Sequence, residues 1–452
     1  MAWIACGLCL VVCLLLPTCN TRKEHKHTNV ILIVIESLRV DHLGCFGYVR
    51  NTSPNLDRLA KECYFFTQAF SPSSWTRTAL ASIVSSTWPT EHGLLSDKMS
   101  DRLADEYITI QEYAKQQGLY TGIIYTNVNC AFGIDQAFDS VMRKLAQRAD
   151  KLFHAAVSWI EKHKQSPFFL YLHVLDPHTP YTNHPQFSFN KGLGDTSRDV
   201  RDLFFVCRHN YTEYEQAAAA GDATWAESIS AEDLAEMLDY YDSEIAYMDH
   251  YIGRLIDYLK YRGLWQNSLV IVTADHGEEF LDHGGYWHGT TLYHELLRVP
   301  LWVHVPGMGQ GICRTRVSTI DIFPTVMEFL AGTTAHSAQV KGRSLLPIIG
   351  GEKAEARRFI AATHFRIPRT ICLIDKDYKL IKRPGQNRLE LYNITEDPGE
   401  TRDLSAHSAL LKPMNAILNR AIKKGKRQPP RPEAEEQLDA DAIAALKSLG
   451  YM

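Results

Sequence analysis

Five short runs of apolar, often β-branched residues recur along the chain and constrain its fold more than any other feature. They are Val30–Ile35, Tyr120–Tyr125, Phe168–Val174, Leu269–Thr273 and Leu301–Val305. Runs of this kind are typical of strands buried on both faces of a sheet. Helical patterns lie between them, at Ser53–Glu62, Ala79–Val84, Gln147–His163 and Ala231–Tyr261. The alternation predicts an α/β fold with a doubly wound, largely parallel sheet.

The pattern changes near residue 340. Four short runs then predict a small antiparallel sheet, at Phe359–Ala362, Thr370–Ile374, Lys379–Lys382 and Leu389–Asn393. A linker is expected next, and the basic stretch Lys423–Arg427 is interpreted as part of this solvated segment. A terminal helix is expected at Asp439–Leu449. With 452 residues, the chain is predicted to comprise a main domain at 29–335 and a C-terminal subdomain at 336–452.

The N-terminal segment has the composition of an export signal. Met1–Pro17 carries no charged side chain and contains the apolar run Leu8–Leu16, which is short for a membrane span. Residues 1–19 are therefore predicted to be a signal peptide or lipoprotein signal, and 20–28 a linker. Cleavage gives a secreted protein, whereas lipidation of Cys19 gives membrane attachment as a periplasmic or cell-surface lipoprotein. Lipidation is the favoured alternative.

Charge and cysteine usage exclude two classes of function. The net charge of −4 does not suit a nucleic-acid partner. The cysteines beyond residue 20 are scattered without a C-x-x-C pair, which excludes a cysteine zinc cluster and leaves buried thiols or one or two disulfides open. The long helix predicted at Ala231–Tyr261 carries acids that we interpret as a packed surface face without catalytic role, namely Asp239, Asp242, Glu244 and Asp249.

Chemistry-bearing residues follow several of the predicted strands. Glu36 comes directly after the first, Asp275–His276 after the fourth, and His178 shortly after the third. Each has a structural alternative when it is taken alone, such as a helix cap or a hydrogen-bonded pair. Because the carboxyl ends of parallel strands meet at one edge of a sheet, we expect them to converge there. Hydroxyl groups are expected at the same edge, from the Ser71–Ser82 stretch that follows the segment 63–70. An Asp, a Glu, a His and a hydroxyl form an oxygen-rich set with one imidazole, which suits Mn²⁺, Mg²⁺, Ca²⁺ or Zn²⁺.

The motifs resemble those of sulfatases in the alkaline phosphatase superfamily. They occur in family order over nearly all of the mature chain, at Val30–Tyr48, Thr87–Gly93, His173–Tyr181, Thr273–Glu278, His288–Tyr293, Arg298–Leu301, Asp321–Thr325, Leu391–Leu404 and Leu449–Tyr451. The resemblance implies an alkaline-phosphatase-like α/β fold and a metal-dependent hydrolase of sulfate or phosphate-type esters. The implied substrate is a small-molecule, glycan or lipid ester.

The nucleophile position departs from the sulfatase pattern. That family converts a Cys or Ser in C/S-x-P-S-R to formylglycine, and places a Pro 13 residues further on. Thr76 has this spacing to Pro89, whereas Ser73 needs three extra residues within a helix. Ser73 has only the spacing to Arg77 in its favour. Thr76 is therefore the expected nucleophile, with Leu80 in place of the family's arginine.

The remaining motif positions imply one divalent metal ion. The family's first metal aspartate is Glu36 here, its second acidic position is Ser37, and its Asp-Asn pair is Asp275–His276. This set resembles that of the threonine-dependent phosphoethanolamine and phosphoglycerol transferases of the same superfamily. We expect Glu36, Thr76, Asp275 and His276 to hold Mn²⁺, Ca²⁺ or Mg²⁺, with Zn²⁺ less favoured.

The other expected site residues follow from the resemblance. His178 and His288 are assigned to binding the ester oxygens or protonating the leaving group. His173, His283 and Asn127 are assigned to substrate binding, although the family's Lys-Trp-His stretch is replaced here by Tyr125–Asn127. A transferase of the phosphoethanolamine or phosphoglycerol type, and a catalytically degenerate binding protein, are the alternatives.

Overall fold

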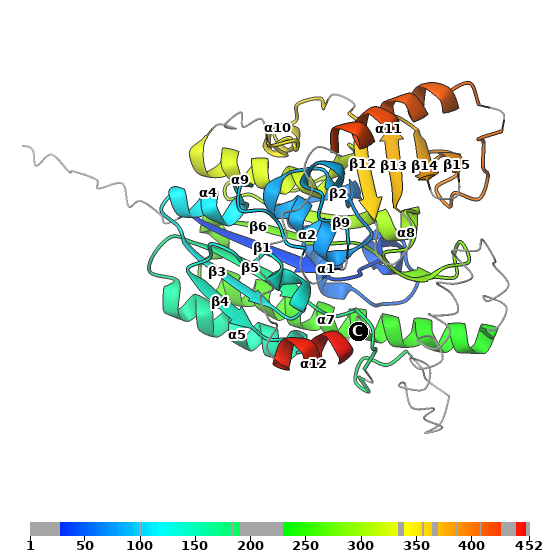
Figure 1. The fold of residues 1–452 in the computed structure, drawn as a ribbon. Helices are drawn as coiled ribbons and strands as arrows, with labels where there is room; N and C mark the ends of the chain where they lie inside the picture. Colours follow the sequence, from blue (N-terminus) through cyan, green and yellow to red (C-terminus); the bar gives the residue numbers. More distant parts are fainter. Residues whose placement is uncertain are drawn as a thin grey trace, which may run out of the picture.

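The computed structural model describes residues 28–96, 98, 101–182, 184–189, 229–332, 339–354, 357–363, 369–384, 387–406, 408–425 and 440–448. A central sheet runs through the larger part of the fold in the order β10-β2-β9-β6-β1-β5-β3-β4, and β11 pairs with β2 (Figure 1). Its strands are β1 (Asn29–Ile35), β2 (Tyr64–Phe70), β3 (Tyr120–Tyr125), β4 (Ser140–Arg143), β5 (Phe168–Val174), β6 (Ser268–Ala274), β9 (Arg298–His304), β10 (Gly311–Cys313) and β11 (Val317–Ser318).

The predicted α/β class is correct, and four of the five apolar runs form the parallel centre of the sheet. β1 lies between β5 and β6, and all of its residues are buried. The fifth run, β9, pairs antiparallel with both β6 and β2. The strand β2 matches the segment 63–70, whose end was expected at the site, but it is not one of the five continuous apolar runs. It carries polar Thr67 and Gln68 among its apolar residues, which interrupts the continuous pattern.

Helices cover both faces of the sheet. In the view of Figure 1, α5 and α7 lie below it, and α2, α4 and α9 lie above it. The helices of the main domain are α1 (Pro54–Leu59), α2 (Thr76–Ser85), α3 (Pro89–His92), α4 (Ile110–Gln116), α5 (Ala149–His163), α7 (Ala231–Tyr261), α8 (His294–Leu297), α9 (Ile322–Ala331) and α10 (Leu346–Ile349). This layering is that of a doubly wound α/β protein.

The four predicted C-terminal strands form a separate antiparallel sheet in the order β12-β13-β14-β15. Their bounds are Phe359–Thr363, Thr370–Asp375, Tyr378–Arg383 and Arg388–Asn393. One face of this sheet shares a hydrophobic cluster with Phe70 and Leu297 of the main domain. The terminal helix is α12 (Ala440–Ser448). The predicted division at residue 335/336 falls where residues 333–338 are not described, and Leu345 and Ile349 beyond it pack in the large core.

The linker predicted before the terminal helix is wrong over much of its length. Residues 411–425 form the helix α11, which covers the second face of the small sheet (Figure 1). Met414 and Leu418 are buried there, against Leu373 and Leu380 among others. Lys423 is exposed at the end of this helix rather than in a linker. The apolar side chains of α11 recur at a helical period, which predicts a helix, whereas the basic composition of its end is typical of a solvated segment.

The surface interpretation of the acids in α7 is also wrong. Asp242, Glu244 and Asp249 are at most 1 % exposed. Asp249 accepts hydrogen bonds from the backbone N–H groups of Asn55 and Leu56 at the start of α1. These carboxylates are buried because partners from elsewhere in the fold pair with them, which helical periodicity alone does not show.

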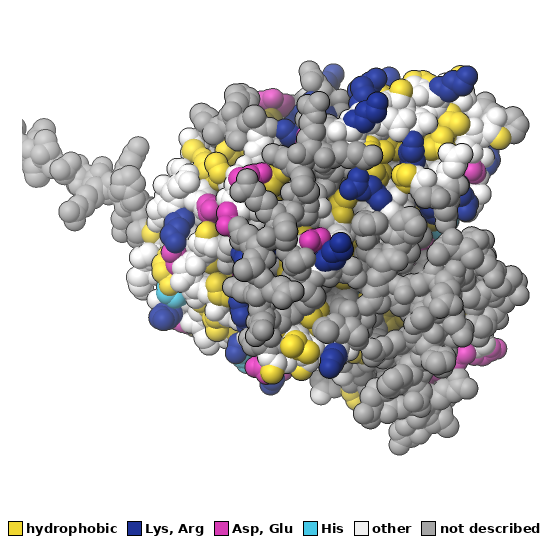
Figure 2. All heavy atoms as spheres, in the orientation of Figure 1, with side chains coloured by type: hydrophobic (Ala, Val, Ile, Leu, Met, Phe, Trp, Pro, Cys, Tyr) yellow, Lys and Arg dark blue, Asp and Glu magenta, His cyan; other side chains and the backbone are white. Residues whose placement is uncertain are grey.

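The described surface and cysteines agree with a globular chain of mixed charge. Lys and Arg side chains lie mainly over α11 and the small sheet in Figure 2, separated by apolar and neutral atoms. Within the described residues no helix combines the length and the apolar character needed to cross a bilayer. The five described cysteines are all free.

Candidate active site

Parallel strand pairing brings Glu36 and Asp275 together. Ile35 of β1 pairs with Ala274 of β6, so the residue after each strand emerges at the same edge of the sheet. The N–H of Glu36 donates to the carbonyl of Val174 at 2.9 Å, and the N–H of Asp275 donates to that of Ile35 at 3.1 Å. Both side chains are fully buried. The two carboxylates therefore occupy fixed positions where strands deliver ligands in open α/β sheets.

Thr76 joins this group from the first turn of α2. Its Oγ1 donates a hydrogen bond to Oε1 of Glu36 at 3.0 Å and lies 3.1 Å from Nε2 of His276. Trp75 before it is extended, with φ −132° and ψ 127°, so the helix begins at the threonine itself. Three side chains that lie 40 and 200 positions apart in sequence thus meet at one hydroxyl oxygen.

Ser73, the rejected alternative, has different contacts. Its Oγ accepts a hydrogen bond from the N–H of Trp75 at 3.2 Å, and its carbonyl accepts one from the hydroxyl of Ser71. These bonds shape the turn that enters α2. The turn positions Thr76, and within the described part of the chain these hydrogen bonds of Ser73 reach neither Glu36 nor His276.

Asp275 and His276 form a coupled pair. One carboxylate oxygen of Asp275 accepts the N–H groups of Ser37 and His276, at 3.1 and 2.8 Å. Burial favours its neutral form, but the neighbouring His276 and His173 outweigh burial and lower the pKa of Asp275. Burial lowers the pKa of His276 despite the opposing charge of Asp275. At neutral pH the pair is thus an anionic oxygen beside a neutral imidazole, which is the ionisation that a metal ligand requires.

The donor set fits a divalent cation. Oδ2 of Asp275 is buried and accepts no hydrogen bond from the described residues. Oγ1 of Thr76 lies between Glu36 and His276, and Nε2 of His276 lies 3.5 Å from Oδ2 of Asp275. Two carboxylates buried this close together, those of Glu36 and Asp275, repel each other, and a bound metal ion would compensate their charge.

Two further histidines, His178 and His288, lie beside His276 and Glu36. The rings of His178 and His288 lie 5.0 Å apart, and those of His276 and His288 4.5 Å apart. Nε2 of His178 is 3.8 Å from Oε1 of Glu36. Burial lowers the pKa of His178 to about 3 and places that of His288 well below its ordinary value. Both imidazoles are therefore neutral near pH 7 and able to meet an anionic ester without a fixed positive charge.

Asn127 and His173 lie beside two different carboxylates of this group, Glu36 and Asp275. The side-chain amide of Asn127 donates a hydrogen bond to Oε1 of Glu36, the oxygen that Thr76 also contacts. Nε2 of His173 lies 3.9 Å from Oδ2 of Asp275. Because His173 belongs to β5 itself and is fully buried, it lies within the sheet beside Asp275. Its position suits support of Asp275 rather than direct contact with a substrate.

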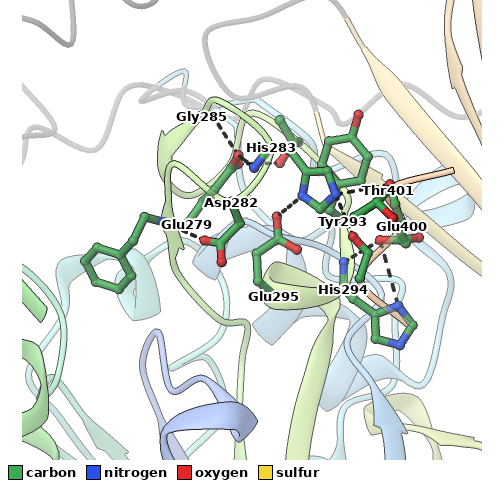
Figure 3. Close-up of polar contacts among 12 residues, drawn as sticks. Glu279, Asp282, His283, Gly285, Tyr293, His294, Glu295, Glu400 and Thr401 are labelled. Carbon is green, nitrogen blue, oxygen red and sulfur yellow. Dashed lines mark hydrogen bonds and ion pairs between the residues drawn. The ribbon is translucent and has the colours of Figure 1, made fainter. Parts of the chain in front are cut away.

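The structure places His283 in a different cluster (Figure 3). Its Nδ1 lies 2.8 Å from Oε1 of Glu295, and its Nε2 lies 3.1 Å from the carbonyl of Gly399 in the C-terminal part. The ring stacks on Tyr293 at 3.7 Å. Both ring nitrogens therefore face acceptors, so His283 binds the two parts of the fold together. Within the described residues, these contacts of His283 involve none of Thr76, Glu36 and Asp275.

Two other groups of acids and a histidine lie outside the Thr76 site. In each, one potential ligand atom per residue lies within 4.8 Å of the others: Asp176–His184–Glu244 and Glu279–His283–Glu295. The set Glu36–Asp275–His276 is not one of these groups among the described residues. The first group already contains a cation, since Arg148 lies 3.3 Å from Asp176 and 3.8 Å from Glu244.

Sequence reasoning missed Glu278 and Trp75. Glu278 is fully buried, and its Oε1 lies 2.9 Å from Nδ1 of His288. Burial raises the pKa of Glu278 well above its ordinary value. The ring of Trp75 stacks over that of His288, with centroids 6.0 Å apart. The signal available in the sequence was the position of both residues beside residues already assigned, Thr76 and Asp275–His276.

Two family models match the chain. The model described as Sulfatase matches residues 28–333, and that described as N-sulphoglucosamine sulphohydrolase, C-terminal, matches residues 282–428. The first covers the central sheet and every residue of the Thr76 group. The second covers the small antiparallel sheet and α11, so the two models together account for both parts of the described fold.

Proteins of similar sequence or structure align with this chain over most of their own length. The N-acetylglucosamine-6-O-sulfatase of Bacteroides thetaiotaomicron is 22 % identical, over 88 % of this chain and 86 % of its own. Among solved structures, a 2-O GAG sulfatase superimposes with a TM-score of 0.71 at 18 % identity, covering 92 % of this chain and 97 % of its own. The phosphonate monoester hydrolase of Silicibacter pomeroyi superimposes with a TM-score of 0.69 at 18 % identity, covering 90 % of this chain and 96 % of its own.

Proposed function

The chain belongs to the sulfatase family of sulfuric ester hydrolases, and from this premise we propose that it hydrolyses sulfate or phosphate-type monoesters with Thr76 as the nucleophile. The observation that carries the proposal is the position of the Thr76 hydroxyl, between Glu36 at 3.0 Å and His276 at 3.1 Å. No other hydroxyl described above makes both contacts.

The reaction proceeds in two steps. Oγ1 of Thr76 attacks the sulfur or phosphorus atom, its proton leaves along the hydrogen bond to Glu36, and the bond to the leaving oxygen breaks. A divalent cation held by Glu36, Asp275 and His276 would lower the pKa of that hydroxyl and favour attack. Water then displaces Thr76 from the threonyl ester, which releases sulfate or phosphate and restores the hydroxyl.

His178 and His288 act on the oxygens of the ester. Both are buried beside the Thr76 group, and their rings lie within 5.0 Å of each other. They donate hydrogen bonds to the non-bridging oxygens, and an imidazole that has taken up a proton from solvent together with the anionic ester gives this proton to the leaving oxygen. Asn127 fixes Glu36 through its amide, and His173 supports Asp275 from within the sheet.

The substrate class we propose is a sulfated sugar or a related small-molecule ester. The relatives named above are a sugar sulfatase, a glycosaminoglycan sulfatase and a phosphonate monoester hydrolase. All three names describe hydrolases, which supports hydrolysis over transfer to a glycan or lipid acceptor. A threonine cannot form the formylglycine of other sulfatases, so phosphate and phosphonate monoesters belong in the same test.

The test is turnover by the purified, metal-loaded chain. The substrates are 4-nitrophenyl sulfate, 4-nitrophenyl phosphate, a 4-nitrophenyl phosphonate monoester, a phosphate diester and N-acetylglucosamine 6-sulfate. We expect multiple turnovers of at least one monoester, with free sulfate, phosphate or phosphonate as product. A product joined to added glycerol or ethanolamine would indicate the transferase, and tight binding without turnover of any substrate would indicate the degenerate binding protein.

We also propose that the chain is exported. Residues 1–27, which include the predicted signal and Cys19, lie outside the described residues, so the support is the sequence pattern alone. A cell-surface or periplasmic lipoprotein remains the favoured form, with secretion after plain cleavage as the alternative.

A further inference from the structure

A two-stranded hairpin places Glu278 opposite His288. The strands β7 (Glu279–Phe280) and β8 (Tyr286–Trp287) are antiparallel, with Glu279 paired to Trp287 and Phe280 to Tyr286. The residues next outward on the two strands are therefore Glu278 and His288. Directly opposed side chains in an antiparallel pair lie close enough to interact. The register of the hairpin thus fixes which carboxyl group meets this imidazole.

The contact between the two side chains engages Nδ1 of the His288 ring and does not involve its Nε2. Oε1 of Glu278 lies 2.9 Å from Nδ1 of His288, and both residues are fully buried. Nε2 of His288 is also buried, and it has no hydrogen-bond partner among the described residues. The ring faces those of His276 and His178, at 4.5 and 5.0 Å. Nε2 is therefore the nitrogen left to meet an ester bound at Thr76.

The backbone at His288 is held in an uncommon conformation. Trp287 has φ +76°, which is rare for a bulky residue, and Gly289 has φ +83°. A positive φ at a residue with a bulky side chain, as at Trp287, is typical of functional sites, whereas glycine adopts it without strain. On the other side of the contact, Arg39 donates a hydrogen bond to the carbonyl of Glu278 at 3.1 Å. Both ends of the Glu278–His288 contact are thus anchored by the surrounding fold.

We propose that Glu278 is a positioning residue, which holds Nδ1 of His288 so that Nε2 remains directed at the leaving oxygen of the substrate. This inference rests on the proposed function, because it gives His288 the task of protonating that oxygen. Without the carboxyl group, the imidazole is free to turn about its side-chain bonds, and either nitrogen can face the substrate. The loss is then one of orientation and not of substrate affinity.

The experiment compares two leaving groups in variants of Glu278. For Glu278→Ala we expect kcat on N-acetylglucosamine 6-sulfate, a poor leaving group, to fall by about 100-fold. On 4-nitrophenyl sulfate, which needs no proton to leave, kcat should fall by less than about 10-fold, with KM unchanged for both. Glu278→Gln keeps an oxygen opposite Nδ1 and should recover most of the loss. If the wild-type chain hydrolyses phosphate esters faster than sulfate esters, the corresponding alkyl and aryl phosphate esters replace the two sulfate esters.

The matched control is Glu279→Gln, the next residue of the hairpin. Glu279 is equally buried, but its oxygens accept hydrogen bonds from Gly285 and Thr291 instead of contacting His288 (Figure 3). Its kcat ratio between the two leaving groups should equal that of the wild type. An equal loss on both substrates in Glu278→Ala, or a rise in KM alone, would overturn the inference.

A double-mutant cycle covers the case in which Glu278→Ala does not fold. The cycle uses Glu278→Leu, which fills the site but has no oxygen opposite Nδ1. Alone, it should lower kcat on the poor leaving group more than on 4-nitrophenyl sulfate, and in a His288→Ala background it should add no further dependence on the leaving group, because the residue to be positioned is gone. An undiminished effect of Glu278→Leu in that background would overturn the inference. Failure of the proposed function is distinct, since the wild-type chain would then turn over neither class of ester.

Discussion

The hydroxyl of Thr76 lies 3.0 Å from the carboxylate of Glu36, although 40 residues separate them in the chain. Glu36 follows the central strand β1 directly, and Thr76 begins α2, which comes after β2, a strand separated from β1 in the sheet by β9 and β6. The same hydroxyl lies 3.1 Å from His276 at the end of β6. Side chains from three different places at the sheet edge thus fix the position of the Thr76 hydroxyl oxygen. The expected roles of Thr76 as nucleophile and of Glu36 and His276 as metal ligands both depend on this position.

Thr76→Ala should abolish turnover of every ester that the wild type hydrolyses, because no attacking oxygen remains. Thr76→Ser keeps the oxygen and should retain measurable activity. The measurement is kcat/KM on the best monoester, and a loss of at least about 1000-fold is expected for alanine. Ser73→Ala is the control, since Ser73 contacts the turn backbone; comparable losses in both variants would point to damage of the turn instead of loss of a nucleophile.

Removal of divalent metal should abolish activity, and Mn²⁺, Ca²⁺ or Mg²⁺ should restore it better than Zn²⁺. Elemental analysis of the purified chain should give one metal ion, and this ion should be lost in Glu36→Gln and His276→Ala. Glu279→Gln is the matched control, because Glu279 belongs to the separate group with His283 and Glu295. Loss of metal from that control with retention in the first two would place the ion in the other group.

The charge of His283 should make stability fall at alkaline pH. Burial opposes this charge, but Glu295 outweighs burial and raises the pKa of His283 to about 9. A raised pKa contributes stability that is complete below about pH 6.5 and is lost as the pH rises through 9. The difference in unfolding free energy between wild type and His283→Gln should therefore shrink by up to about 3 kcal/mol between pH 6 and 9.5.

Urea unfolding at several pH values measures this difference for His283. The exposed His154 offers a control, since His154→Gln removes an imidazole from the surface of α5. Its difference from wild type should not change over the same range. A constant difference for His283→Gln as well would contradict a charged His283 at neutral pH.

The helix α11 should contribute to the stability of the C-terminal part. Leu418 is fully buried against the small sheet, so Leu418→Ala should lower the free energy of unfolding by about 2–5 kcal/mol. Leu410→Ala, just before the helix, removes a side chain that is 39 % exposed and should change it by less than about 1 kcal/mol. Thermal or urea unfolding compares the two, and equal small effects would mean that α11 does not pack as a structural element.

Cys19→Ser should separate the two forms of export. If Cys19 is lipidated, the wild-type chain should incorporate labelled palmitate and sediment with membranes, whereas the variant should do neither. Release of both proteins into the soluble fraction, with the same cleaved N-terminus, would indicate plain secretion. Retention of the uncleaved chain in the cytoplasm would contradict the export signal.

Local sequence determined the strands that are continuous apolar runs, the helices α1, α2, α5, α7 and α12, and the residues that follow those strands. Val30–Ile35 and Phe168–Val174 were recognisable because burial on both faces leaves a continuous apolar run, and this pattern is local. The predicted convergence of Glu36, Asp275 and His276 follows from parallel pairing, which brings the ends of such strands to one edge. Spacing to Pro89 favoured Thr76 over Ser73, and the observed contacts of the two side chains agree with that preference.

Only the tertiary structure decided which side chains meet between distant segments. His283 was grouped with the site by sequence, yet Glu295 and the carbonyl of Gly399 engage both of its nitrogens. Glu278 was passed over, although a hairpin register places it against His288. The acids of α7 and the apolar face of α11 find their partners in other elements. Such pairings depend on how separate elements pack, and neither hydrophobic period nor motif spacing along one segment contains that information.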